Sequence, residues 1–119
     1  MKAIGVDIVE IDRVADSVTR FGDRFLKRVY TAQELIYCNG RISSLAVRWA
    51  AKEAVAKALG TGIGAVSWQD IEVVSDANQC PSVRLHGAAA DLAGRLGINE
   101  FAVSLSHAKE YAMAFVVGE

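Results

Sequence analysis

The residues best suited to chemistry lie in the stretch RWAAKEAVAKALGTGIG, residues 48–64. One acid, Glu53, stands there among three cations, which are Arg48, Lys52 and Lys57. Residues four apart share one face of a helix, so Glu53 and Lys57 can form an ordinary surface pair. A lone carboxylate among cations also suits a magnesium ion on a polyphosphate, because carboxylates bind the metal while lysine and arginine balance the phosphate charge.

A second carboxylate, Asp7, interrupts the apolar run AIGVDIV of residues 3–9. Burying an unpaired carboxylate costs several kcal/mol, so Asp7 has to face a metal ion, a cation or a hydrogen-bond network. The alternative is an acid on an edge strand that caps a neighbouring loop. Together, Asp7 and Glu53 can supply the carboxylates of a magnesium site.

A glycine-rich string follows the helix and consists of Gly60, Thr61, Gly62, Ile63 and Gly64. A role as the helix C-cap is enough to explain Gly60. Gly62 and Gly64 are not needed for capping and would let the backbone approach a ligand closely, although a merely flexible loop is an equal alternative. The string follows a helix and not a strand, which excludes a dinucleotide-binding fingerprint.

Two further polar residues, Ser106 and His107, stand at a predicted hairpin turn. No third member of a nucleophile triad accompanies them, but both can donate hydrogen bonds to a phosphate. A lone histidine at a turn is otherwise an ordinary surface residue.

The charge distribution limits the possible partners. A net charge of −1 over 119 residues argues against a general nucleic-acid binder. Residues 13–28 nevertheless carry +3, including Arg13, Arg20 and Arg24, and form either a solvated face or a docking site for an acidic partner. No apolar run approaches the ~20 residues of a membrane span, and the N-terminus lacks the pattern of a secretory signal, so we expect a cytoplasmic protein without membrane contact.

Periodicity and turn signals predict the elements that position these residues. The first strand, at 3–9, reads as buried, and a helix follows at 11–20. Thr31 opens a short helix toward Cys38 through a capping box, and the long helix spans 43–59. The second half reads as strands 68–74 and 82–86, a helix at 88–96, and strands 101–106 and 111–117 around a turn at 107–110. We expect one α+β domain, residues 1–119, with antiparallel β hairpins packed on a long central helix.

The motifs, taken in this order, resemble holo-acyl-carrier-protein synthase, the short, trimeric class of 4′-phosphopantetheinyl transferases. The resemblance covers nearly the whole chain and rests on IGVDIVEIDR, FLKRVYTAQEL, RWAAKEAVAKALGTGIG, DIEV and VSLSHAKEYAMAFVV. The paired signature consists of Gly5-Val6-Asp7 and the run from Trp49 to Ala58.

The resemblance implies magnesium-dependent transfer of 4′-phosphopantetheine from coenzyme A to a serine of apo acyl carrier protein, in support of fatty acid biosynthesis. Asp7 and Glu53 would hold Mg²⁺, and Lys57 would meet phosphate oxygens. Arg48 and Lys52 would add positive charge, the loop 60–64 would line the nucleotide, and Ser106 and His107 would lie near its adenosine end. The base that accepts the serine proton stays open between Glu53, Glu34 and a metal-bound water.

The resemblance also implies that Arg13, Arg20 and Arg24 face an acidic helix of the carrier protein. Such a short chain would build its site between the subunits of a homotrimer, with strands 101–106 and 111–117 as candidate interface. Three alternatives remain, namely a transferase acting on a carrier domain of a megasynthase, a non-catalytic coenzyme A-binding module, and an oligomeric scaffold. The scaffold predicts no magnesium-dependent ligand binding.

Overall fold

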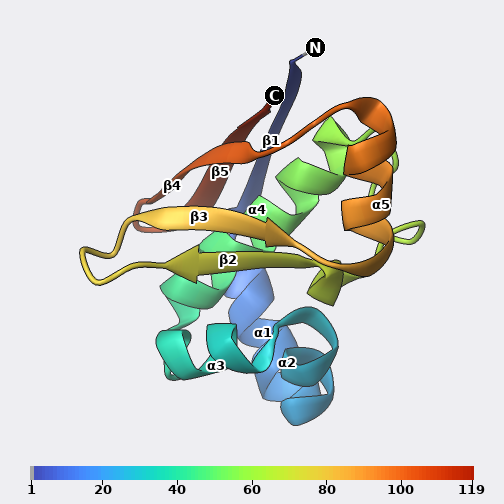
Figure 1. The fold of residues 1–119 in the computed structure, drawn as a ribbon. Coiled ribbons are helices and arrows are strands. Elements are labelled where there is room, and N and C mark those ends of the chain that lie inside the picture. The colour runs from blue at the N-terminus through green and yellow to red at the C-terminus, as the bar shows by residue number, and fades with distance from the viewer. Residues whose placement is uncertain (1) are drawn as a thin grey trace.

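The chain forms two antiparallel sheets, described by a computed structural model over residues 2–119. Strands β1 (Ala3–Glu10), β5 (Tyr111–Gly118) and β4 (Phe101–His107) form the larger sheet in the order β1-β5-β4 (Figure 1). Strands β2 (Ile71–Ser75) and β3 (Pro81–Leu85) form a separate hairpin. The predicted α+β class with antiparallel hairpins is confirmed.

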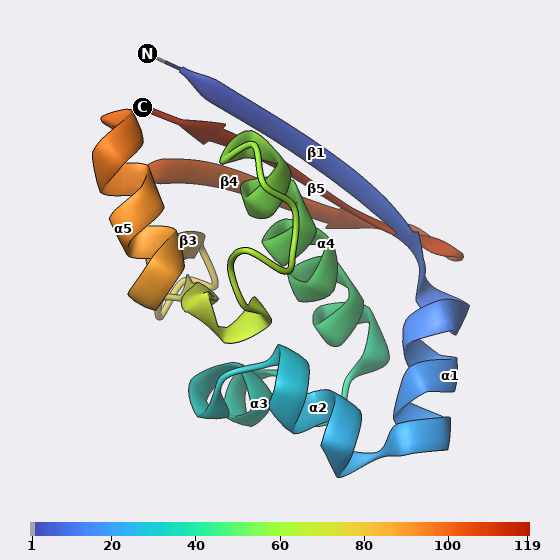
Figure 2. The ribbon, with the colours of Figure 1, turned by 90° about the vertical axis from the view of Figure 1, so that its right-hand side faces the viewer.

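The helices are arranged around the longest of them, α4 (Ile42–Ala58). Figure 2 shows α4 lying along the larger sheet, with α5 (Gly87–Leu96) on its other side. Three shorter helices gather beyond its N-terminal end: α1 (Ile11–Phe21), α2 (Asp23–Val29) and α3 (Ala32–Cys38). Capping by Thr31 and Glu34 starts α3, as the sequence predicted.

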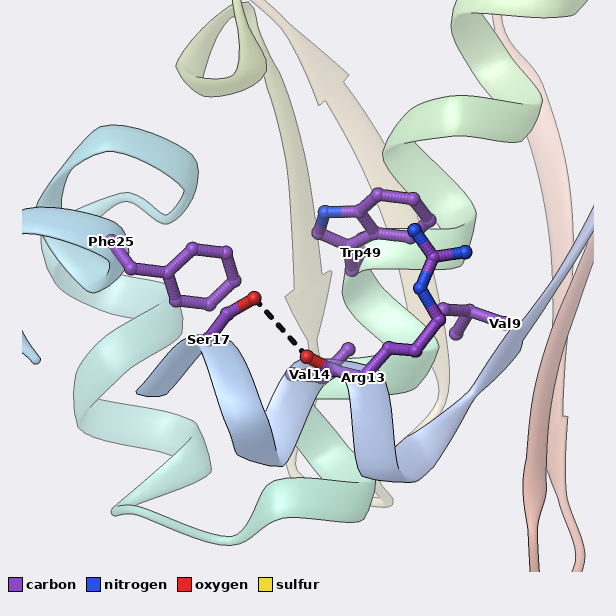
Figure 3. A pocket seen from close by; sticks show the side chains of 6 residues that line it. All are labelled: Val9, Arg13, Val14, Ser17, Phe25 and Trp49. Atoms are coloured by element: carbon purple, nitrogen blue, oxygen red, sulfur yellow. Dashed lines mark hydrogen bonds between the residues drawn. The ribbon is translucent and has the colours of Figure 1, made fainter. Parts of the chain in front are cut away.

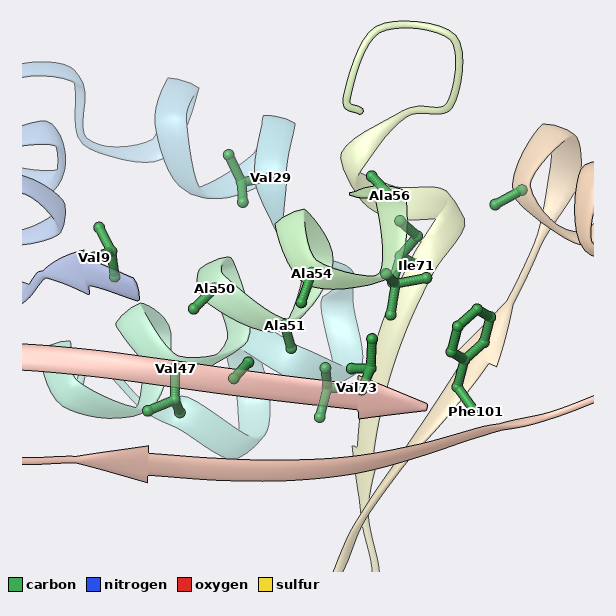
Figure 4. Packing of buried hydrophobic residues seen from close by; sticks show 14 of the residues in the cluster. Val9, Val29, Val47, Ala50, Ala51, Ala54, Ala56, Ile71, Val73 and Phe101 are labelled. Carbon is green, nitrogen blue, oxygen red and sulfur yellow. The ribbon is translucent and has the colours of Figure 1, made fainter. Parts of the chain in front are cut away.

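Alanines let α4 approach the sheet closely. Its buried residues include Ala50, Ala51 and Ala54, which pack in the core shown in Figure 4. On β1, a Cβ added at Gly5 would lie only 1.9 Å from the carbonyl oxygen of Ala54, so only glycine fits there. This close contact brings Asp7, two residues further along β1, beside the C-terminal half of α4.

Several sequence-based boundaries need correction. The first strand is buried on one face only, because Ile4, Val6 and Ile8 on the other face are 50–63% exposed. Residues 68–70 form a 3-10 turn, so the strand predicted at 68–74 begins at Ile71. Helix α2 was not predicted. Strand β4 continues through His107, which pairs with Ala112, so the turn starts one residue later than predicted.

Two features bear on the class of protein. Cys38 and Cys80 are both free thiols, the first buried and the second exposed. Over residues 2–119, none of the helices is both long enough and apolar enough to cross a membrane.

Candidate active site

An ion pair joins β1 to the last turn of α4. The Lys57 Nζ donates a hydrogen bond to Asp7 Oδ1 over 2.7 Å and a weaker one to the Val6 carbonyl oxygen over 3.3 Å. The Asp7 side chain is 13% exposed, whereas that of Lys57 is 52% exposed. The second carboxylate oxygen, Asp7 Oδ2, is buried and has no hydrogen-bond partner among residues 2–119. Of the partners that the sequence left open for Asp7, namely a metal ion, a cation or a hydrogen-bond network, the structure shows a cation.

Glu53 is the second carboxylate of this cluster, one helical turn before Lys57. Partial burial raises its pKa above the ordinary 4.5, the negative charge of Asp7 raises it further, and Lys57 opposes both effects. A carboxylate whose pKa is raised by a neighbouring carboxylate, together with that neighbour's unpartnered oxygen, is a donor set that a divalent cation would stabilise.

The composition of the cluster suits magnesium. Within residues 2–119, no group of three or more His, Cys, Asp or Glu side chains could hold a metal ion, so the cluster offers a metal only the two neighbouring carboxylates of Asp7 and Glu53. Mg²⁺ is commonly bound by one or two carboxylates plus substrate phosphates and water, and does not need an all-protein cage. We name Asp7, Glu53 and Lys57 the carboxylate cluster.

Lys52 does not belong to this cluster, and the prediction that it contacts phosphate is wrong. Its side chain is fully buried, and Nζ donates to Glu34 Oε1 over 2.7 Å. The carbonyl oxygens of Trp68 and Ile71 accept the other two hydrogen bonds, at 3.0 and 2.6 Å. All three ammonium protons are therefore used inside the protein. Burial lowers the pKa of Lys52, and the charge of Glu34 opposes this.

Glu34 is equally committed to structure, which removes it as a candidate base. It is 1% exposed. Besides Lys52, the backbone N–H groups of Thr31 and Val73 donate to its two oxygens, both at 2.9 Å. A buried carboxylate with three donors cannot reach a serine hydroxyl outside the core.

Arg48 and His107 line a second part of the predicted site. Both border an open cavity of about 420 Å³ between α4, the β2–β3 hairpin and β4. Arg48 is 4% exposed, and its guanidinium donates to the Ser44 carbonyl oxygen over 3.1 Å and to Ser75 Oγ over 2.9 Å. Its Nε atom is buried without an acceptor among residues 2–119. We name this the arginine cavity. Ser106 is exposed on β4 immediately before His107.

The two parts face different sides of α4. Arg48 and Glu53 are five residues apart, which separates their directions by about 140° around the helix axis. Glu53 and Lys57 meet β1, whereas Arg48 packs toward α3 and β2. The structure thus brings Asp7, Glu53 and Lys57 together, and separately brings Arg48 to His107.

The glycine-rich loop closes the C-terminal end of α4. The N–H groups of Thr61 and Gly62 both donate to the Ala56 carbonyl oxygen. Gly60, Gly62 and Gly64 have φ values of +82°, +69° and +133°, which side chains other than glycine rarely adopt. Backbone conformation therefore accounts for all three glycines, and Ile63 is held by a bridge to Val66. Close approach to a ligand stays a prediction.

The predicted docking residues lie around α1 and α2. Arg24 borders a groove of about 490 Å³ that also includes Phe21, Phe25 and Arg28. Arg13 borders a neighbouring cavity of about 70 Å³, where Figure 3 shows it with Trp49, Phe25 and Ser17. Arg20 is exposed and lies 3.6 Å from Asp16. We name the groove with its arginines the basic groove.

Some neighbours of these residues were missed by the sequence analysis. Phe21 is 54% exposed beside Arg24, and an aromatic residue next to exposed arginines could have been recognised. Tyr37, Ser75 and Gln79 border the arginine cavity but come from three separate elements or turns. Nothing in their local sequence shows that they meet.

Comparisons with known proteins agree on one family. A sequence profile described as "4′-phosphopantetheinyl transferase superfamily" matches residues 3–116. A holo-[acyl-carrier-protein] synthase of Herpetosiphon aurantiacus is 50% identical over 99% of this chain and 98% of its own.

Solved structures give the same answer. The Helicobacter pylori holo-[acyl-carrier-protein] synthase in complex with coenzyme A superimposes with a TM-score of 0.90 at 35% identity, over 98% of this chain and 99% of that one. The Neisseria meningitidis holo-[acyl-carrier-protein] synthase gives 0.89 at 39% identity, over 98% and 97%.

Proposed function

We propose, since this chain belongs to the holo-[acyl-carrier-protein] synthase family of 4′-phosphopantetheinyl transferases, that it transfers 4′-phosphopantetheine from coenzyme A to a serine of apo acyl carrier protein. The observation that carries the proposal is the carboxylate cluster, in which Asp7 Oδ2 lies buried without a partner beside Glu53 and Lys57. Adenosine 3′,5′-bisphosphate would be the second product, and the chain would act as one transferase unit.

The carboxylate cluster suits a magnesium ion, held by Asp7 and Glu53. When bound, Mg²⁺ would neutralise pyrophosphate charge and orient the group for displacement. Lys57 is half-exposed and would donate to a pyrophosphate oxygen from the same side. Lys57 and the bound Mg²⁺ would thus supply positive charge to the pyrophosphate, and the buried Lys52 would not be needed for this role.

The transfer forms one bond and breaks one. The serine oxygen attacks the phosphorus next to pantetheine, and the bond from that phosphorus to the bridging oxygen breaks. The serine proton has to go to a base, and the bridging oxygen leaves with the adenosine bisphosphate. Of the two side chains considered from the sequence, Glu34 is buried and satisfied, whereas Glu53 is partly open with a raised pKa. Glu53 is therefore the side-chain candidate for the base.

The arginine cavity suits the other phosphate of coenzyme A, the one on the ribose. The side chains of Arg48 and His107 border the same space, and guanidinium and imidazole groups can both donate to phosphate oxygens. The adenosine end would then lie against β4, where Ser106 is also exposed.

A second copy of the chain would bring the two phosphate sites into one cleft. On the outer face of the larger sheet, Ile4, Val6, Ile8, Tyr111, Met113 and Phe115 are 41–63% exposed. Apolar patches of this kind mark protein–protein interfaces. Ser104, which lines the arginine cavity, pairs with Phe115 of the patch, so the patch adjoins that cavity. We propose a homotrimer whose sites combine the carboxylate cluster of one subunit with the arginine cavity of the next.

The basic groove would receive the carrier protein. Arg24 and Arg28 carry positive charge at the edges of a groove with the rings of Phe21 and Phe25, while Arg13 and Arg20 extend the charged surface along α1. An acidic, amphipathic helix matches this pattern of cations around an apolar floor. A role in fatty acid biosynthesis follows from this partner, and the cytoplasmic location stays a prediction.

Mass spectrometry tests the proposal directly. Apo acyl carrier protein incubated with this protein, coenzyme A and Mg²⁺ should gain the mass of one phosphopantetheine arm. Omitting the enzyme is the first control, and a carrier whose acceptor serine is replaced by alanine is the second. No mass gain with several apo carrier proteins and with an excised megasynthase carrier domain, despite coenzyme A binding, would favour a non-catalytic binding module.

A further inference from the structure

Tyr37, at the end of α3, is in contact with the guanidinium group that lines the arginine cavity. The Cζ atom of Arg48 lies 4.3 Å from the centroid of the Tyr37 ring. A second guanidinium, that of Arg41, lies 5.6 Å from the same centroid and donates to the Tyr37 carbonyl oxygen over 2.6 Å. At these distances, cations are attracted by the ring quadrupole.

This contact restricts the orientation of Arg48. A free arginine side chain has many rotamers, and binding with it costs the entropy of fixing one of them. Here the ring of Tyr37 covers one region of the guanidinium, while Ser44 O and Ser75 Oγ accept two of its hydrogen bonds. The group is fixed before any ligand arrives, and its buried Nε–H remains without an acceptor among residues 2–119.

Tyr37 itself borders the arginine cavity together with Arg48 and His107. Tyr37 adds no charge to that cavity, and its ring contributes through geometry and its quadrupole, whereas its hydroxyl is the part that Tyr37→Phe removes. The ring would serve to keep a buried cation in a defined orientation.

We propose that Tyr37 is a positioning residue, which fixes Arg48 so that the site selects coenzyme A over an analogue without the ribose 3′-phosphate. This inference rests on the proposed function, because it assigns that phosphate to the arginine cavity. Ser75 assists by accepting from Arg48 Nη2. The preference for coenzyme A would therefore depend on Tyr37 of α3 and Ser75 of β2, although Arg48 of α4 makes the contact with the phosphate.

The experiment compares two substrates in three proteins. KM and kcat are measured with coenzyme A and with 3′-dephospho-coenzyme A for the wild type, Tyr37→Leu and Tyr37→Phe. We expect Tyr37→Leu to raise KM for coenzyme A by about 10-fold, with a change below about 2-fold for the dephospho analogue and in kcat. Tyr37→Phe keeps the ring and should restore the wild-type preference.

A ratio of the two KM values that stays unchanged in Tyr37→Leu would overturn the inference and leave the proposed function intact. An equal loss with both substrates would also overturn it, because that is the result of general structural damage. Calorimetric titration with adenosine 3′,5′-bisphosphate and adenosine 5′-monophosphate repeats the comparison without catalysis. It tests the positioning role even if the wild type transfers nothing, in which case only the proposed function would fail.

Discussion

Lys57 donates to one oxygen of Asp7 at 2.7 Å, and the other oxygen of Asp7 is buried without a partner. This half-satisfied carboxylate joins two segments fifty residues apart in the chain. A buried acceptor without a donor costs about 1–3 kcal/mol, so a ligand that completes its coordination is favoured at this point.

Removal of either carboxylate should abolish most of the transfer reaction. We expect Asp7→Asn and Glu53→Gln each to lower kcat/KM by at least ~100-fold, on the scale of lost metal-centred catalysis, with the fold retained. The assay is the carrier mass shift at fixed Mg²⁺, and circular dichroism checks the fold. Asp91→Asn, on the exposed surface of α5, is a matched control. Full activity in both variants would exclude the proposed metal site.

The raised pKa of Glu53 predicts how stability and metal binding depend on pH. The pKa of Glu53 is higher in the folded protein than its ordinary value of 4.5, so the folded state favours the protonated form. Glu53 therefore stabilises the fold below pH 4.5, and this contribution is lost as the pH rises through the pKa of the folded state. In chelator at pH 8, Glu53→Gln should therefore melt at a higher temperature than the wild type.

With Mg²⁺ at pH 8, the wild type should instead melt at a higher temperature than Glu53→Gln. Mg²⁺ should stabilise the wild type but not Glu53→Gln, and its effect on the wild type should fade as the solution is acidified toward the Glu53 pKa, because protons compete with the cation. Melting curves with and without Mg²⁺ measure both effects. Equal stabilisation of the two proteins would argue against Glu53 as a ligand.

Lys52 should matter for stability and not for phosphate contact. Lys52→Met removes the counter-ion of the buried Glu34, which keeps only its two backbone donors, and we expect this loss to cost about 3–5 kcal/mol in urea unfolding. Glu34→Gln combined with Lys52→Met should recover part of this loss. Lys57→Met should change stability by less than about 1 kcal/mol while reducing transfer. A fully stable Lys52→Met protein with a raised KM for coenzyme A would restore the original phosphate assignment.

These assignments show how far the sequence alone could lead. Asp7 and Glu53 were singled out because an acid in an apolar strand and an acid among cations can both serve a metal ion, although an edge-strand cap and an ordinary surface pair were open alternatives. Lys52 was misassigned because helix spacing does not reveal that Glu34, 18 residues earlier, enters the core to meet it. The strand at 3–9 was correctly located, but its apolar residues on both faces were read as burial, whereas one face is exposed in the single chain. Tyr37 and Ser75 reach Arg48 only through tertiary packing, which local patterns do not encode.

Charge reversal in the basic groove should affect one substrate only. Arg24→Glu with Arg28→Glu should raise KM for the carrier protein by about 10-fold or more at low salt, with less effect at high salt because exposed charges are screened. KM for coenzyme A should stay within about 2-fold. Arg95→Glu, exposed on α5, has the same charge change away from the groove. If the charge reversal leaves KM for the carrier protein unchanged at low salt, the carrier protein docks at another surface.

The proposed division of the site between subunits makes a sharper prediction than oligomeric state alone. Val6 and Phe115 face each other on neighbouring strands of the exposed apolar face, and both are about half-exposed. Phe115→Glu should yield a folded monomer without transfer activity, as measured by light scattering and the mass-shift assay. Ile36→Glu, on α3 and 70% exposed, is the control that should leave the trimer intact.

Mixing two variants, each impaired in a different half of the proposed site, then distinguishes a site shared between subunits from an assembly that activity merely requires. Glu53→Gln retains its arginine cavity, and Arg48→Ala retains its carboxylate cluster, so a trimer containing both has clefts in which both halves are intact. Co-expressed and purified with two different tags, the mixture should recover a substantial part of wild-type activity, because a subset of interfaces pairs the two unaltered halves. If mixed trimers form but stay inactive, both halves of the site have to act within one subunit. The angle of about 140° between Arg48 and Glu53 around the α4 axis argues against that arrangement.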